Sequence, residues 1–187
     1  MNAAPPAVRY TPVAQLLHWA IAALIVVQFV LASRAEDAPS KMQQLALLTR
    51  HKSFGMTVLM LAVIRLAWRL FHRPPELPVA MKGWERLVAK LTHGAFYVLL
   101  FATPLAGWLM SSARGFTVSW FGLFSWPDLI QRNQGTYEVL KETHETFASI
   151  LFVLAVLHVL AALKHHFWDK DDVLRRMLPF IGQRSGS

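Results

Sequence analysis

Long apolar runs separated by shorter polar segments dominate the hydrophobicity pattern of this chain. An α-helix needs about 20 apolar residues to cross the roughly 30 Å hydrocarbon core of a bilayer. Four runs reach this length, and they predict spanning helices at residues 12–33, 52–71, 91–112 and 144–167. Joined in chain order, they predict a single all-α domain over residues 1–187, a four-helix transmembrane bundle with up-down-up-down topology.

The segments between these runs predict connections and interfacial structure. Residues 34–50 are polar and predict a connection, and residues 72–77 contain two adjacent prolines that end a helix. The pattern of residues 82–90 is amphipathic, so we expect them to lie along the membrane surface. Residues 116–130 are aromatic but interrupted by glycine and proline, which favours the outer membrane interface over a fifth span.

The composition narrows the class of protein. Hydrophobic residues make up 55% of the chain, mean hydropathy is +0.36, and there are no cysteines. Without cysteine, disulfides, thiolate-held iron–sulfur clusters and covalently attached haem are excluded, and histidine is left as the metal ligand. The first apolar run follows Arg9 and is too long for a signal peptide, so we expect it to stay in the mature protein.

The net charge of +8 comes from basic residues that flank the apolar runs. They do not form a stripe with interleaved aromatic residues, so the charge favours a membrane surface over nucleic acid. With both termini inside, 12 of the 19 Lys and Arg residues lie on the inner side. The positive-inside rule therefore predicts a multi-pass protein with both termini in the cytoplasm.

Four histidines fall at two depths in this topology. His144 and His158 lie on one face of the fourth run, about 21 Å apart along a helix. His18 lies at the inner depth of His158, and His51 at the outer depth of His144. An imidazole in hydrocarbon is costly without a partner, and two imidazoles from facing helices are what haem ligation in a bundle requires.

We therefore predict two b-type haems, an inner one held by His18 and His158 and an outer one held by His51 and His144. Any one of these histidines, taken alone, is equally well explained as a polar residue at a helix end. The arrangement of all four in two pairs favours the haem interpretation. Gly55, one turn beyond His51, would let a flat macrocycle approach the backbone.

Several short segments of the chain form a recognisable set: Arg9-Tyr10-Thr11, Leu17-His18-Trp19, His51 to Gly55, Arg65-Leu66 with Arg69-Leu70, His144-Glu145-Thr146, and His158 with the closing His165-His166-Phe167-Trp168 and Leu174 to Pro179. In these segments, residues 9–179 resemble the prokaryotic cytochrome b561 family. The resemblance is greatest to members that oxidise superoxide and reduce ubiquinone. It implies the same four haem ligands and a place in the bacterial inner membrane. Lys90 departs from the pattern, which has a histidine three residues before His93.

An iron with two imidazole ligands has no open position for substrate, so outer-sphere transfer of single electrons is the expected chemistry. We expect superoxide to lose an electron at the outer haem and a membrane quinone to gain electrons at the inner one. A group of outer basic residues would steer the superoxide anion: Arg50, Lys52, Arg114, Arg132 and Lys141. The alternative is that these are ordinary loop charges, partly cancelled by neighbouring acidic residues.

Candidate residues of a quinone site at the inner end are His93, His165, His166 and Trp168. Arg65 and Arg69 are candidate partners for haem propionates. Anchoring at the membrane surface is an equally good explanation for the two arginines and for His165, His166 and Trp168.

Two other functional classes stay open. One is a diheme cytochrome b subunit that links the quinone pool to a partner dehydrogenase or hydrogenase. The other is a non-haem metal transporter or a structural bundle. The outer loops are short and offer no docking platform, which favours a self-contained superoxide:quinone oxidoreductase.

Overall fold

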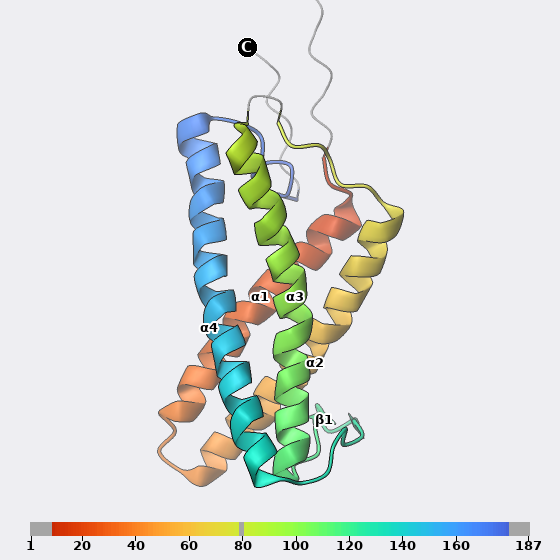
Figure 1. Cartoon of the computed structure of the whole chain (residues 1–187), viewed down its shortest axis with the longest axis vertical. Coiled ribbons are helices and arrows are strands. Elements are labelled where there is room, and N and C mark those ends of the chain that lie inside the picture. The colour runs from red at the N-terminus through yellow and green to blue at the C-terminus, as the bar shows by residue number, and fades with distance from the viewer. Residues whose placement is uncertain (1–8, 79–80, 180–187) are drawn as a thin grey trace, which may run out of the picture.

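Four long helices run along the molecule in the computed structural model, which describes residues 9–78 and 81–179 (Figure 1). They are α1 (Pro12–Glu36), α2 (Lys41–Phe71), α3 (Gly83–Arg114) and α4 (Gln134–Lys164). Each is long and apolar enough to cross a membrane. A small antiparallel hairpin, β1 (Ser119–Trp120) with β2 (Phe124–Ser125), follows α3, and a π-helical turn, η1 (His165–Asp169), continues α4.

The helices are longer than the four predicted spans, and two expectations about the connections are wrong. Residues 34–50 do not form a long polar connection, because α1 continues to Glu36 and α2 already begins at Lys41. The Ser40 hydroxyl accepts a hydrogen bond from the Gln43 amide at 3.3 Å and caps the new helix. Polar helical turns therefore extend beyond the apolar run, and only a four-residue turn joins α1 to α2.

Residues 82–90 do not form a separate surface helix. They are the first turns of α3, which starts at Gly83 and is supported by a hydrogen bond from the Lys82 amide to the Glu85 carboxylate at 3.2 Å. Similarly, Asn133 caps α4 through the Thr136 amide at 2.9 Å, ten residues before the expected start. His51 and His144 therefore lie inside their helices and do not open them.

The bundle consists of two helical hairpins, α1 with α2 and α3 with α4, which meet along α2 and α3. In the described residues, no Cα atom of α1 lies within 8 Å of one in α4. Ile21, Val58, Ala62 and Leu100 form the buried core where α1, α2 and α3 meet. Many other large apolar side chains are exposed, as expected for helices that face lipid.

The two ends of the chain meet at one end of the bundle. Arg176 accepts hydrogen bonds through its carbonyl from the Tyr10 amide at 3.4 Å and from Gln15 Nε2 at 2.9 Å. The indole nitrogen of Trp19 donates to the Met177 carbonyl at 2.9 Å. The first and last sequence motifs that resemble the family are therefore in contact in the fold.

The aromatic hairpin lies at the opposite end of the bundle (Figure 1) and does not span the membrane. Ser53 of α2 is only 1% exposed and holds the hairpin in place. Its hydroxyl accepts from the Phe121 amide at 3.1 Å and lies 3.0 Å from the Ser119 carbonyl oxygen. Trp120 adds a hydrogen bond from its indole nitrogen to Thr57 Oγ1 at 3.1 Å.

Replacing Ser53 by alanine is expected to leave buried polar groups of the hairpin without a partner and to cost about 1–3 kcal/mol. Thermal unfolding in detergent measures the effect. Ser149→Ala is the matched control, because the Ser149 hydroxyl bonds only to a carbonyl in its own helix, that of Glu145 at 2.8 Å. Equal losses in the two variants would show that Ser53 does not hold the hairpin.

Candidate cofactor site

The four predicted histidines lie in two pairs, one at each depth of the bundle. The ring centroids of His18 on α1 and His158 on α4 are 6.3 Å apart, and their planes differ by 71°. Those of His51 on α2 and His144 on α4 are 6.1 Å apart, with planes at 80°. Each pair therefore joins one helical hairpin to the other. In the described residues, the Cα atoms of α4 stay farther than 8 Å from those of α1 and α2, so the pairs bridge this wider gap.

The spacing of each pair fits a metal ion between two imidazoles. A metal–imidazole nitrogen bond is about 2.0–2.1 Å long, so two imidazoles on opposite sides of one metal have centroids roughly 6 Å apart. Direct packing of two aromatic rings also covers this distance. The hydrogen bonds of the outer pair favour the metal.

Both outer imidazoles are held through Nδ1 by backbone carbonyls. His51 Nδ1 lies 3.3 Å from the Gln28 carbonyl oxygen, and His144 Nδ1 lies 2.9 Å from that of Thr103. A carbonyl oxygen can only accept, so Nδ1 carries the proton in both rings and Nε2 of the neutral ring is free to bind a metal. Metal-binding histidines are oriented in this way in most proteins.

Two buried polar atoms beside the outer pair also indicate a bound group. Gln28 Oε1 and Thr103 Oγ1 have no hydrogen-bond partner among the described residues. Buried polar atoms without a partner are rare, because each costs about 1–3 kcal/mol. Both belong to the residues whose carbonyls hold the histidines. The polarity of Gln28 within an apolar run was the one signal in the sequence that could have identified it.

The inner pair has a third histidine beside it. The His93 ring on α3 has its centroid 5.7 Å from that of His158, and Phe96 is 5.3 Å from the same ring. The structure thus places His93 directly against the pair, at the depth expected from the sequence. His158 therefore has two neighbours, His18 and His93, at distances that fit a shared metal.

Apolar side chains fill the space between the two levels. Leu151 lies midway between His144 and His158 in α4, is 6% exposed, and is the one buried residue of that helix. Phe29 and Phe152 pack edge to face at 5.1 Å between α1 and α4. Apolar side chains of α1 and α4 therefore lie between the two histidine pairs.

Two glycines allow close contacts around the outer pair. A Cβ atom on Gly107 of α3 would lie 3.0 Å from His144 Cε1 and Nδ1, so a larger residue would push this ring away from its hydrogen bond to the Thr103 carbonyl. A Cβ atom on Gly55 would lie 2.9 Å from Gln28 Nε2. The Gln28 amide lies over Gly55 in this structure, where its Nε2 donates to the His51 carbonyl at 3.0 Å, and the approach of a macrocycle to Gly55 stays a prediction.

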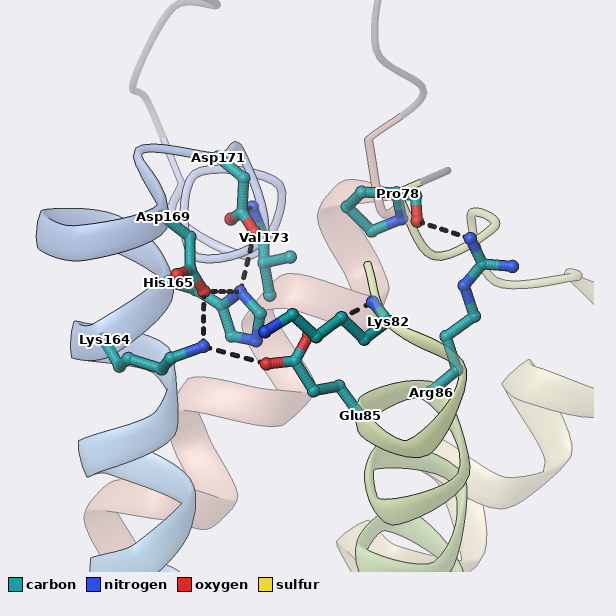
Figure 2. Close-up of polar contacts among 9 residues, drawn as sticks. All are labelled: Pro78, Lys82, Glu85, Arg86, Lys164, His165, Asp169, Asp171 and Val173. Atoms are coloured by element: carbon teal, nitrogen blue, oxygen red, sulfur yellow. Dashed lines mark hydrogen bonds and ion pairs between the residues drawn. The ribbon is translucent and has the colours of Figure 1, made fainter. Parts of the chain in front are cut away.

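Figure 2 shows the inner end of α4, where His165 faces two carboxylates. His165 Nδ1 lies 2.7 Å from Asp171 Oδ2 and 3.0 Å from Asp169 Oδ2. These three side chains could hold a metal ion. However, Lys164 Nζ already pairs with Asp169 at 2.8 Å and with Glu85 at 2.9 Å. The cluster is therefore explained as an ion-pair network that joins α4 and η1 to α3.

The other residues expected at a quinone site, which lie together in η1, do not contact His93. His166 contacts Phe167 at 4.8 Å, and the Trp168 side chain is 85% exposed. No contact in the described part of the chain joins these residues or His165 to His93. Only His93 thus lies against the histidine pair.

The two predicted propionate partners line one pocket at the inner end of the bundle. Arg65 Nη1 donates to the Ala14 carbonyl at 2.7 Å, and Arg69 lies 5.5 Å from the Tyr97 ring centroid. Ala14 and Tyr97 lie one helical turn from His18 and His93 respectively. Both arginines are therefore close to the inner histidines and have only neutral partners in these contacts.

The outer basic residues differ in their surroundings. Lys52, next to His51, is half-buried; its ammonium group donates to Ser111 Oγ at 2.7 Å and lies 5.3 Å from the Phe116 ring centroid. Lys141 is paired with Glu145 at 2.8 Å, and Arg114 stacks on Tyr137 at 4.4 Å. Arg132 packs its aliphatic carbons near Gly115, and Arg50 is exposed. Lys52 is thus the basic residue adjacent to the outer pair.

Comparisons with known proteins agree with this arrangement. The chain matches the family model described as prokaryotic cytochrome b561 over residues 9–180. It is 35% identical over 176 residues to cytochrome b561 homolog 2 of Escherichia coli (strain K12), which covers 91% of each chain. It is 31% identical over 165 residues to the probable superoxide oxidase CybB of Yersinia pestis, which covers 87% of this chain and 92% of that protein. Homolog 2 thus shares more identical residues with the chain than the superoxide oxidase does.

Gly107→Ala is expected to displace His144 and to lower the amount of haem bound per chain, since the matched family consists of cytochromes. Visible absorption and total protein measure the ratio. Gly94→Ala on the same helix is the control, because a Cβ atom there meets nothing within 4 Å. Full haem content in the Gly107 variant would contradict the proposed role of this close contact.

Proposed function

We propose that this chain, which belongs to the prokaryotic cytochrome b561 family, is a diheme cytochrome b that oxidises superoxide and reduces a membrane quinone. The family and the four spans show a multi-pass membrane cytochrome that carries electrons. The observation that carries the two-haem part of the proposal is the presence of two histidine pairs at two depths of one bundle, and the half-buried Lys52 beside the outer pair supports superoxide as the substrate.

The chain's own residues would hold the two haems as follows. His51 and His144 would hold the outer iron, and their Nδ1–H groups would donate hydrogen bonds to the Gln28 and Thr103 carbonyls. His18 and His158 would hold the inner iron, and Arg65 and Arg69, which line the pocket at this end, would pair with its propionates. Haem supplies one-electron chemistry when bound, and a second imidazole on each iron leaves no position for an inner-sphere substrate.

The outer end suits an anionic substrate. Lys52 holds a positive charge beside His51 in a half-buried position, fixed by Ser111 and Phe116. A cation held near a redox centre attracts an anion such as superoxide and raises its association rate. One relative bears the name probable superoxide oxidase, which supports this substrate. Three other relatives bear names of cytochromes only.

The overall reaction balances with a quinone at the inner end. Two superoxide anions each lose one electron and leave as oxygen, and one quinone takes up these two electrons and two protons to form a quinol. We place the quinone near His93, the one candidate that lies against the inner pair. His165, His166 and Trp168 keep a role at the membrane surface near this end. The charge distribution supports cytoplasmic termini and superoxide access from the periplasm.

The alternative, a diheme subunit that serves a partner enzyme, shares the same histidine pairs. A rapid-mixing experiment separates the two. Superoxide added to the ferric protein in detergent is expected to reduce the haem at a rate near the diffusion limit, and ubiquinone added afterwards should reoxidise it. Slow reduction of the haem by superoxide, or a reduced haem that quinone does not reoxidise, would favour the alternative, an electron carrier that serves another donor.

Substitution of single histidines tests the ligand assignment. His144→Ala and His51→Ala are each expected to lose the outer haem, and His18→Ala the inner one, which leaves about one haem per chain. His93→Ala is the informative control, because His93 is as near to His158 as His18 is. Haem content should stay at two in this variant. Loss of one haem in His93→Ala, with full haem content in His18→Ala, would show that His93 and not His18 is the inner haem ligand.

Lys52→Gln tests the attraction of superoxide. Its rate of haem reduction should fall by about 3- to 10-fold at low salt, and its dependence on ionic strength should weaken. Lys41→Gln removes the same charge from an exposed position at the same end of the bundle and should change little. Equal rates for both variants would remove Lys52 from the proposed mechanism.

A further inference from the structure

A basic pocket opens at the inner end of the bundle, where the segment before α1 meets α2, the loop after it, and α3. Four arginines line it: Arg9, Arg65, Arg69 and Arg73. Aromatic side chains, among them Trp68 and Tyr97, form its walls, and no acidic residue is part of the lining. The pocket therefore combines a high positive charge with apolar surfaces.

Three of the arginines lead from the bundle to its end. Arg65 and Arg69 lie four positions apart and therefore follow one face of α2, about 6 Å apart along the axis. Arg65 is the most buried of the three, and Arg73 lies beyond the helix, in the loop that begins at the extended residue His72. Arg65 is thus nearest to the inner histidines, while Arg73 lies at the rim of the pocket.

The protein does not neutralise this charge itself. In the described part of the chain, none of the four arginines forms an ion pair. Arg9 and Arg65 donate to the carbonyls of Leu178 and Ala14, and Arg69 stacks over Tyr97. Like charges in one pocket repel each other, so an anion bound among them would stabilise the fold.

The surroundings of the rim indicate what kind of anion binds. Leu70 and Phe71 lie at the end of a membrane-spanning helix, shortly before Arg73 in the chain, and are 74% and 83% exposed. The His72 ring stacks on Trp68 with centroids 3.9 Å apart and forms a flat wall beside Arg73. A free phosphate would use only the arginines, whereas a phospholipid would also cover the apolar residues with its acyl chains.

We propose that Arg73 and Arg9 at the rim of this pocket bind the phosphate of an anionic phospholipid whose acyl chains lie along Leu70 and Phe71. Guanidinium groups bind phosphate oxygens through two parallel hydrogen bonds, and basic pockets between transmembrane helices on the cytoplasmic side suit acidic headgroups. The site is independent of the electron-transfer reaction. It leaves Arg65 and Arg69 for the haem propionates.

Stabilisation by defined lipids tests the proposal. Delipidated protein in detergent is heated with phosphatidylglycerol or with phosphatidylcholine of the same acyl chains, and its melting temperature is recorded together with its haem content. Phosphatidylglycerol should raise the melting temperature more than phosphatidylcholine. Arg73→Glu should abolish this preference. Lys90→Glu makes the same change of charge on the exposed surface of α3, outside the pocket, and should keep the preference.

Several outcomes would overturn the proposal. Equal stabilisation by both lipids would show that the headgroup charge is not recognised. The same effect from inorganic phosphate would show that the site takes a free anion. Equal loss in the Arg73 and Lys90 variants would indicate a general effect of surface charge, and loss of haem in Arg73→Glu would assign the rim to the haem. If Arg73→Glu is unstable, Arg73→Gln takes its place in each comparison, because it removes the positive charge without introducing a negative one.

Discussion

The cost of placing an imidazole in hydrocarbon is the constraint on which the rest of this structure depends. A polar side chain in the bilayer needs a partner for each of its hydrogen-bonding atoms. In the outer pair, Nδ1 of both rings is satisfied by the backbone, through the Gln28 and Thr103 carbonyls. A metal bound by the remaining nitrogens would satisfy them, and the rings face each other at about the spacing that a shared ion needs.

The helix arrangement follows from the same requirement. α1 and α2 form one hairpin and α3 and α4 the other, and α4 contacts α1 and α2 through side chains and not through close backbone packing. A bundle built only to pack its helices would bring these backbones together, at interaxial distances of about 8–10 Å. The wider separation leaves room for flat cofactors, and Leu151 and Phe152 close the layer between the two levels.

The sequence predicted the number of spans, their order and the depth of each histidine, because apolar length and residue spacing determine these features directly. It placed the helix starts too late at Lys41, Gly83 and Gln134, since polar helical turns beyond the membrane carry no hydropathy signal. It could not identify the Thr103 carbonyl, because any residue can supply a backbone oxygen. The contact of Gly107 with His144 was equally hidden, since it depends on how closely two helices approach.

The central claim, that each histidine pair holds one haem iron through two imidazoles, is tested most directly by electron paramagnetic resonance of the ferric protein, together with haem and iron analysis. Two haems per chain and two low-spin signals of high anisotropy are expected, because the imidazole planes are nearly perpendicular in both pairs. A high-spin signal, or a single low-spin species with one haem per chain, would contradict the account.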